Sequence, residues 1–213
     1  MRRLAALVTA LIAVGGFALA ASPAGAAAHR PNARATAPTV VSRVRPVTAT
    51  GALRSGYTVA HNVSHASCQA GSEAVGDAYR CFGPRFVYDP CWATSDKGFV
   101  DCLPTPYSHQ VTRLHVTKGF DNQGGLGSAA RIPWGLRLAG GTRTTLLQGA
   151  SGTVKGMRIN YEVKGFRVVL VGPVDKSGST WTIREGKRTH GVYKIVGRVD
   201  ISTAWFGQRS HKG

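Results

Sequence analysis

Four cysteines lie within one short part of this 213-residue chain, and the sequence contains no others. They are Cys68, Cys81, Cys91 and Cys102. An even number of cysteines in an exported chain predicts a disulfide framework, because the compartments outside the cell are oxidising. Two disulfides so close together require a fold in which neighbouring segments of this part lie side by side.

The first 28 residues have the features of a signal peptide. An arginine pair precedes an uncharged run from Leu4 to Ala20, and small residues follow as far as Ala28. This order is typical of a secretory leader. A retained membrane anchor is the alternative, but the small-residue region and the Gly15-Gly16 break argue against it. We expect cleavage after Ala26 or Ala28 and a secreted, extracellular or envelope-associated protein without an integral membrane segment.

The four cysteines permit three disulfide connectivities. Sequential pairing joins Cys68 with Cys81 and Cys91 with Cys102, and it closes two short loops. We predict this pairing. Each loop of that size contributes about 3 kcal/mol in the chain-entropy description of disulfides.

The rest of the chain divides into a linker, one domain and a tail. Residues 29–56 are rich in Ala, Thr, Pro and Arg and lack helical periodicity, which predicts a disordered or extended linker. One disulfide-stapled β domain is expected over residues 57–206, since about 150 residues suffice for a hydrophobic core. Residues 207–213 form a basic tail.

The pattern within the domain is mostly that of β-strands. Short β-branched or aromatic runs alternate with clusters of Gly, Pro, Asn and Asp. The expected strands are Phe99–Cys102, Gln110–Lys118, Trp134–Leu138, Thr142–Leu147, Met157–Val163, Phe166–Val171, Thr180–Arg184 and Val192–Phe206. This spacing predicts a mainly β fold, a single antiparallel sandwich or barrel-like domain with a disulfide-stapled N-terminal segment. Only residues 73–80 have the pattern of a short helix.

The chain is strongly basic. Its 27 Lys and Arg residues against 10 Asp and Glu give a net charge of +17, and loss of Arg2 and Arg3 with the leader leaves +15. Such a surface attracts polyanions in a salt-dependent way. We expect anionic cell-envelope polymers as partners and no specific nucleic acid, because aromatic residues do not interleave with the basic ones. The oligomeric state is left open.

Several short motifs surround the cysteines. Ser67-Cys68 to Ser72, Asp77-Ala-Tyr-Arg-Cys81, Asp89-Pro-Cys91-Trp92 and Cys102-Leu-Pro104 occur in this order, and Ile132-Pro-Trp-Gly-Leu-Arg-Leu138 follows. Together they resemble a group of secreted actinobacterial proteins that have no assigned activity, over residues 67–206. The resemblance supports the two disulfides and a secreted β-rich domain. It supplies no catalytic residues.

Members of that group carry a further cysteine pair. Thr144 occupies the place of the first cysteine in this chain, and Glu162 or Val163 occupies that of the second. Both cysteines of the pair are therefore absent from this chain, as expected where one whole disulfide is missing.

Two patterns near Cys68 resemble catalytic or metal sites. The segment Ser64 to Cys68 is similar to the S-H-G-C signature of L,D-transpeptidases, although an extra residue separates His65 from the cysteine. His61, His65 and Cys68 could supply three zinc ligands. A disulfide at Cys68 excludes both the transpeptidase site and the zinc site, because the thiolate would be the nucleophile in the first and a metal ligand in the second. Exposed histidines and a bridged cysteine are the favoured interpretation.

Other side chains have a structural and a functional interpretation. Asp77, Asp89 and Asp101 are favoured as turn or ion-pair residues, with a local Asp77–Arg80 pair, over acid catalysts. The aromatic residues could fill a β core or line a carbohydrate-binding face, and the core is favoured. They are Trp92, Trp134, Trp181, Trp205, Tyr88, Tyr107 and Tyr161.

The sequence therefore predicts a non-enzymatic extracellular or envelope-associated binding or structural domain. We assign no catalytic residue, no cofactor and no metal from the sequence. Two alternatives remain open. One is a cell-envelope hydrolase or transpeptidase whose active site has no motif, and the other is a secreted protease inhibitor with a rigid exposed loop such as Pro104 to Ser108.

Overall fold

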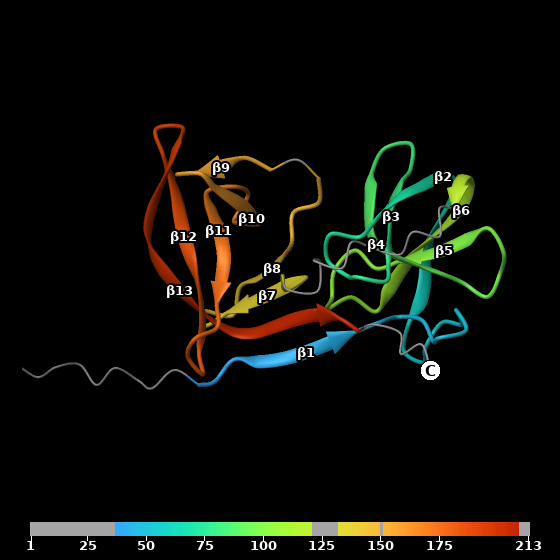
Figure 1. The fold of residues 1–213 in the computed structure, drawn as a ribbon, viewed down its shortest axis with the longest axis horizontal. Coiled ribbons are helices and arrows are strands. Elements are labelled where there is room, and N and C mark those ends of the chain that lie inside the picture. The colour runs from blue at the N-terminus through green and yellow to red at the C-terminus, as the bar shows by residue number, and fades with distance from the viewer. Residues whose placement is uncertain (1–36, 121–131, 150, 209–213) are drawn as a thin grey trace, which may run out of the picture. The chain divides into compact units, whose positions relative to one another are not determined.

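The computed structural model describes residues 37–120, 132–149 and 151–208. Within these ranges every regular element is a β-strand (Figure 1). The strands are β1 (Val40–Val44), β2 (Thr58–Gly71), β3 (Tyr79–Phe82), β4 (Val87–Ala93), β5 (Phe99–Cys102), β6 (Gln110–Phe120), β7 (Gly135–Leu138), β8 (Arg143–Thr145), β9 (Thr153–Val154), β10 (Met157–Val163), β11 (Val168–Asp175), β12 (Trp181–Thr189) and β13 (Val192–Gly207). The described part of the chain contains no helix that is long and apolar enough to span a membrane.

The strands form a large sheet and a small closed barrel. The sheet has the order β8-β7-β13-β12-β11-β10-β9, with β1 added beside β13, and the barrel has the order β2-β3-β4-β5-β6. Neighbouring strands pair antiparallel, except that β1 runs parallel to β13 and β2 runs parallel to β6. The predicted mainly β fold of sandwich or barrel-like architecture is confirmed, and all eight predicted strands are present.

Three hydrophobic clusters lie in the described part of the chain, and two of them involve the barrel. The larger one contains Leu136, Leu170 and Ile183 of the sheet, and it includes Trp92 and Leu103 from the barrel strands and their connections. The Trp92 and Trp134 rings meet edge to face, with 6.1 Å between their centroids. The smaller cluster fills the barrel and contains all four cysteines together with Val100 and Leu114. The disulfides are thus part of the barrel core.

The predicted linker over residues 29–56 requires a correction. Its first residues lie outside the described part, but Val40–Val44 is strand β1 and pairs with Thr203–Gly207. Thr39 Oγ1 donates to the Ile201 carbonyl at 2.6 Å and accepts the Trp181 N–H at 2.7 Å. Val40 and Val41 are exposed, so backbone pairing rather than an apolar face holds this strand. The alternation of apolar and polar residues by which strands are predicted is therefore missing in this segment.

The short helix expected over residues 73–80 is also wrong. The Ser72 hydroxyl accepts the N–H groups of Ala74 and Val75, both at 3.0 Å, and the Ser72 N–H donates to the Ala78 carbonyl at 2.8 Å. These bonds close a compact turn, and β3 begins at Tyr79. A helix rises about 1.5 Å per residue and would carry the Ser72 N–H and the Ala78 carbonyl apart, so the bond between them marks a turn in place of a helix.

The predicted leader, residues 1–28, lies outside the described residues. The predicted tail begins inside β13, because Gly207 ends that strand and the Gln208 N–H donates to the Val44 carbonyl at 2.9 Å. Residues 209–213 are not described.

The role of β1 can be tested with Thr39→Val. This change leaves the Trp181 N–H and the Ile201 carbonyl without their side-chain partner, so we expect a loss of about 1–3 kcal/mol in the free energy of unfolding. Urea unfolding monitored by tryptophan fluorescence measures it. The exposed Thr153 provides a matched Thr→Val control. Equal stability of the Thr39 and Thr153 variants would show that the segment before β2 does not hold the fold.

Candidate functional site

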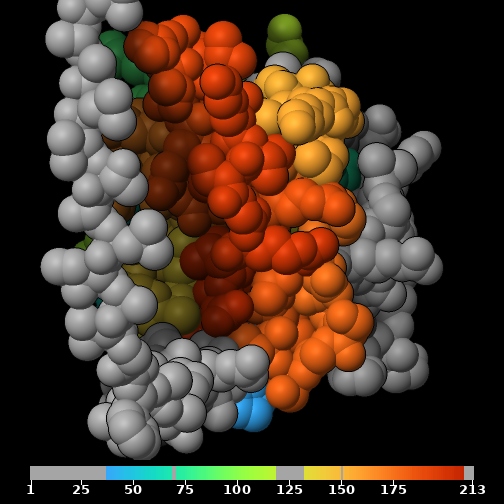
Figure 2. Space-filling view, turned by 90° about the vertical axis from the view of Figure 1, so that its left-hand side faces the viewer, coloured from blue at the N-terminus to red at the C-terminus, as the bar shows by residue number. Residues whose placement is uncertain are grey.

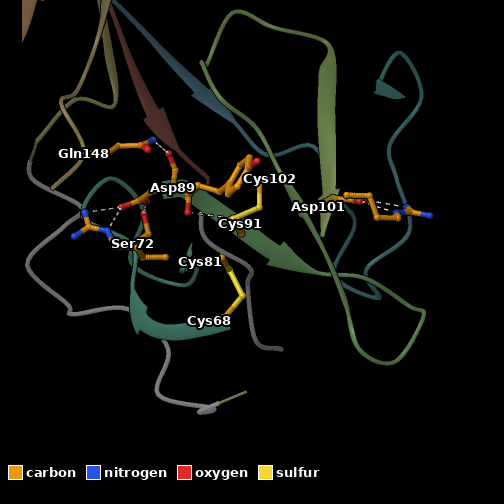
Figure 3. The surroundings of a disulfide bond; sticks show 11 residues. Cys68, Ser72, Cys81, Asp89, Cys91, Asp101, Cys102 and Gln148 are labelled. Carbon is orange, nitrogen blue, oxygen red and sulfur yellow. Dashed lines mark hydrogen bonds and ion pairs between the residues drawn. A yellow bond between two sulfur atoms is a disulfide. The ribbon is translucent and has the colours of Figure 1, made fainter. Parts of the chain in front are cut away.

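All four cysteines are bonded in the predicted sequential order. Cys68 is bonded to Cys81, and Cys91 to Cys102, so none is free. Each disulfide joins residues that lie directly opposite each other on antiparallel strands. The two bridges are neighbours, because the sulfur atoms of Cys81, Cys91 and Cys102 all lie within 4.8 Å of one another (Figure 3).

The bonded cysteines remove the cysteine chemistry considered from the sequence. Cys68 is buried in a disulfide and has no thiolate to attack an acyl group or to bind zinc. His61 and His65 lie exposed on β2. The structure therefore does not bring these histidines and a cysteine thiolate together as a site.

A buried carboxylate organises the region around the disulfides. Asp89 is 3 % exposed and accepts hydrogen bonds from the Ser72 hydroxyl and from the Glu73 N–H at 3.0 Å. The Arg80 guanidinium donates to it through Nε at 3.0 Å and through Nη2 at 2.8 Å. Burial raises the pKa of the Asp89 carboxyl, and these donors oppose the shift. Both carboxylate oxygens of Asp89 thus accept hydrogen bonds from groups of the fold.

This network reaches strands of the large sheet. The Gln148 side-chain amide donates to the Asp89 carbonyl (Figure 3). Glu73 binds Arg80 at 2.9 Å and Arg158 of β10 at 2.7 Å. The network therefore links the barrel strands to the segment after β8 and to β10.

The other two candidate acids also form ion pairs. Asp77 binds Arg45 at 2.6 Å, so the predicted Asp77–Arg80 pair is wrong. Asp101 is fully buried and receives two bonds from Arg113, at 2.8 and 2.9 Å. The bonds to Asp101 raise the pKa of Arg113. Each of the three candidate aspartates is thus paired with an arginine of the fold.

The aromatic residues divide between the core and the surface. Trp92, Trp134 and Tyr161 are buried, and the Tyr161 hydroxyl donates to the Pro133 carbonyl at 2.6 Å. Burial raises the pKa of Tyr161. The other four are partly exposed, and of these Tyr88 and Tyr107 line a cleft. The predicted core role is right for the three buried rings.

The loop considered for protease inhibition does not project as a free loop. In the segment Pro104 to Ser108 only Pro104 is exposed, and Pro106 is buried. A Cβ added at Gly135 would come within 2.5 Å of the Pro106 ring, so the loop packs closely against β7. A protease would meet a packed segment rather than an extended one.

The densest group of exposed basic residues lies on two adjacent hairpins. The β10–β11 turn and the β12–β13 hairpin lie at the same end of the sheet, because Val168 pairs with Lys187. We call this group the hairpin surface, and its exposed cations are Lys164, Arg167, Lys187, Arg188, Lys194 and Arg198. Figure 2 shows β12 and β13, in orange and red, extending over the centre of the face that they form.

Hydrogen bonds fix the two hairpins to each other. The Tyr193 hydroxyl donates to the Phe166 carbonyl at 2.8 Å, and the Arg188 N–H donates to the Arg167 carbonyl at 3.0 Å. His190 and Gly191 both have positive φ, 50° and 81°, as a two-residue hairpin turn of type I′ requires. The cations thus project from ordered strands and tight turns.

Like charges face each other across this hairpin. Lys187 pairs directly with Lys194, and Arg184 pairs directly with Arg198. Like charges at directly opposed positions destabilise a sheet. Arg198 is partly neutralised by Asp175 at 3.0 Å, whereas the nearest acid to Lys187 is Glu185 at 3.6 Å. This arrangement favours an anion at the hairpin surface.

The sequence does not predict this surface, although it contains all of the basic residues that form it. The cations appear evenly spread along the chain, and only the antiparallel pairing of β11, β12 and β13 gathers them. The run from Arg184 to Lys194 contains four cations and one acid, which is the available signal.

Comparison with known proteins gives no match, either to a family model, to a curated protein or to a solved structure.

Asp89→Asn tests the buried network. Replacement removes the buried one of the two carboxylates that pair with Arg80, and Glu73 remains as the other, so we expect a loss of about 1–3 kcal/mol in the free energy of unfolding. Urea unfolding measures it, with the exposed Asp175→Asn as the matched control and an expected change below about 1 kcal/mol. A similar small change in both variants would contradict the organising role of Asp89.

Removal of one disulfide tests its contribution. The double change Cys68→Ala and Cys81→Ala opens a bridge with a sequence separation of 13 residues. We expect a loss of about 3 kcal/mol in unfolding free energy. Connectivity is checked by trypsin digestion of unreduced wild-type protein, since cleavage after Arg80, Arg85 and Lys97 places each cysteine on its own peptide. The peptide of Cys68 should stay joined to that of Cys81, and the peptide of Cys91 to that of Cys102; any other joined pair would contradict the pairing.

Proposed function

We propose that this protein is an exported, non-enzymatic binding domain that attaches to anionic polymers of the cell envelope through the hairpin surface. The proposal depends on one observation, the directly opposed and exposed pair Lys187–Lys194, which lies among further exposed cations of the two hairpins. An arrangement that costs stability in the free protein is retained where it serves binding. A bound polyanion relieves the repulsion and releases counterions.

An extracellular location is supported by three observations of different kinds. The N-terminal residues have the order of regions typical of a signal peptide. The two disulfides are stable in an oxidising compartment. The described residues include no helix that could cross a membrane, which is compatible with this location.

A repeating polymer fits the hairpin surface better than a small anion does. The six cations are spread over one turn and two strands. Exposed apolar side chains lie among them, namely Phe166, Val192 and Val196. A flexible chain with many negative charges can contact several cations at once, and the apolar side chains can contact its uncharged parts.

The double change Lys187→Gln and Lys194→Gln tests the proposal. We expect weaker cosedimentation with purified cell walls and a smaller salt dependence, because each lost contact lowers the slope of log K against log salt by about one. We also expect unchanged or higher stability, because the change removes a repulsive pair. Cosedimentation over a salt series and urea unfolding measure the two effects.

Lys97→Gln with Lys155→Gln is the matched control, since it removes the same charge from exposed positions outside the hairpin surface. The control should bind as the wild type does. Equal weakening in both double variants would assign binding to net charge alone. Wild-type binding that is absent or insensitive to salt would exclude the polyanion.

A further inference from the structure

A cleft whose lining residues do not belong to the hairpin surface is a second candidate site. It has a cavity volume of about 440 Å³ and is lined by residues 143–148, by Glu162 of β10, by the start of β4 and by residues 102–104 and 107. Small-ligand sites are clefts of similar size, lined by apolar groups with a few polar ones. The polar groups of this cleft include the side chains of Tyr88, Tyr107, Arg143, Thr145, Gln148 and Glu162.

Two opposite charges in this cleft lack a partner in the described structure. The acids Glu73, Asp77, Asp89, Asp96, Asp101, Asp175 and Glu185 each form an ion pair. Of the described acids, Glu162 and Asp200 form no ion pair with a described residue, and of these two Glu162 lines the cleft. Arg143, which lines the same cleft, forms none with a described acid either. The two do not neutralise each other, so each can accept an opposite charge from a ligand.

The side chains around these charges are held in place. The Arg143 guanidinium lies over the Tyr107 ring, 5.3 Å from its centroid. The Tyr107 hydroxyl and the Thr145 Oγ1 share a hydrogen bond of 2.8 Å. The Thr144 hydroxyl donates to the Glu162 carbonyl at 2.6 Å, which fastens β8 to β10. A site with fixed groups loses less entropy on binding.

The strand register sets the points from which the two side chains leave the sheet. The bridge between Leu146 and Tyr161 is antiparallel, so its continuation places Thr145 opposite Glu162 and Arg143 on the diagonal. The backbone positions of diagonal neighbours on a sheet are about 7–8 Å apart, and two extended residues of a peptide span about 7 Å. The two side chains therefore start about one dipeptide length apart, and each can extend toward one end of such a ligand.

We propose that this cleft binds a short zwitterionic peptide, with its carboxylate on Arg143 and its ammonium group on Glu162. The carboxylate would receive charge-assisted hydrogen bonds from a guanidinium already positioned by Tyr107. A polyanion is disfavoured here because Glu162 repels it. A neutral sugar is disfavoured as well, because it carries no charge that could pair with Arg143 or with Glu162. The proposal is independent of the hairpin surface.

Calorimetry with dialanine and its two blocked forms tests the proposal. Dialanine should bind at a single saturable site, and N-acetyl-dialanine and dialanine amide should each bind about tenfold more weakly. Glu162→Gln should weaken dialanine about tenfold and leave N-acetyl-dialanine unchanged. Arg143→Gln should weaken dialanine similarly and leave dialanine amide unchanged.

The controls are Asp200→Asn and Arg137→Gln, which remove charges outside the cleft and should bind dialanine as the wild type does. The variant Lys187→Gln with Lys194→Gln should also keep its dialanine affinity, which separates this site from envelope binding. Absence of dialanine binding, equal binding of the blocked forms, or binding of N,N′-diacetylchitobiose in its place would overturn the proposal.

Discussion

The buried carboxylate of Asp89 is the group on which the arrangement of the neighbouring segments depends. It receives donors from the turn after β2, from Arg80 of β3 and, through its own carbonyl, from Gln148. A charge this deeply buried is tolerated only when donors surround it. The Asp89 side chain therefore holds the turn after β2 and the β3–β4 pair, its backbone carbonyl holds the segment after β8, and the two disulfides lie beside it in the barrel core.

The distribution of charge follows from the scarcity of acids. Most described acids are used in ion pairs within the fold, as Asp89 is with Arg80 and Asp101 with Arg113. Few acids remain to neutralise exposed cations, so the hairpin surface stays positive. Glu162 and Asp200 are the described acids without an ion pair, and Glu162 lies in a cleft with Arg143. The scarcity of acids is therefore the physical basis of both proposals, an anion at the hairpin surface and a doubly charged ligand in the cleft.

The sequence predicted the sheet strands better than the barrel strands, for a physical reason. The strands of the sheet are β-branched and apolar, as in Val168–Val171, and their turns contain glycine. β2 is polar and rich in His, Asn and Ser, so its propensity for strand is weak and its parallel pairing with β6 holds it. β1 lacks an apolar face for a similar reason. The segment after Ser72 has a helical pattern in the sequence, but it forms a compact turn in which the Ser72 hydroxyl accepts the N–H groups of Ala74 and Val75.

The sequence by itself determined the fold class, the positions of eight strands and the cysteine pairing, because these depend on alternation, turn residues and short loops. Only the tertiary structure decided which charges meet. Asp77 pairs with Arg45 rather than Arg80, and Lys187 faces Lys194 across a hairpin. Arg143 and Glu162 reach one cleft because β8 lies beside β10. Such contacts join residues that are distant along the chain, and their register is set by packing, which no local pattern records.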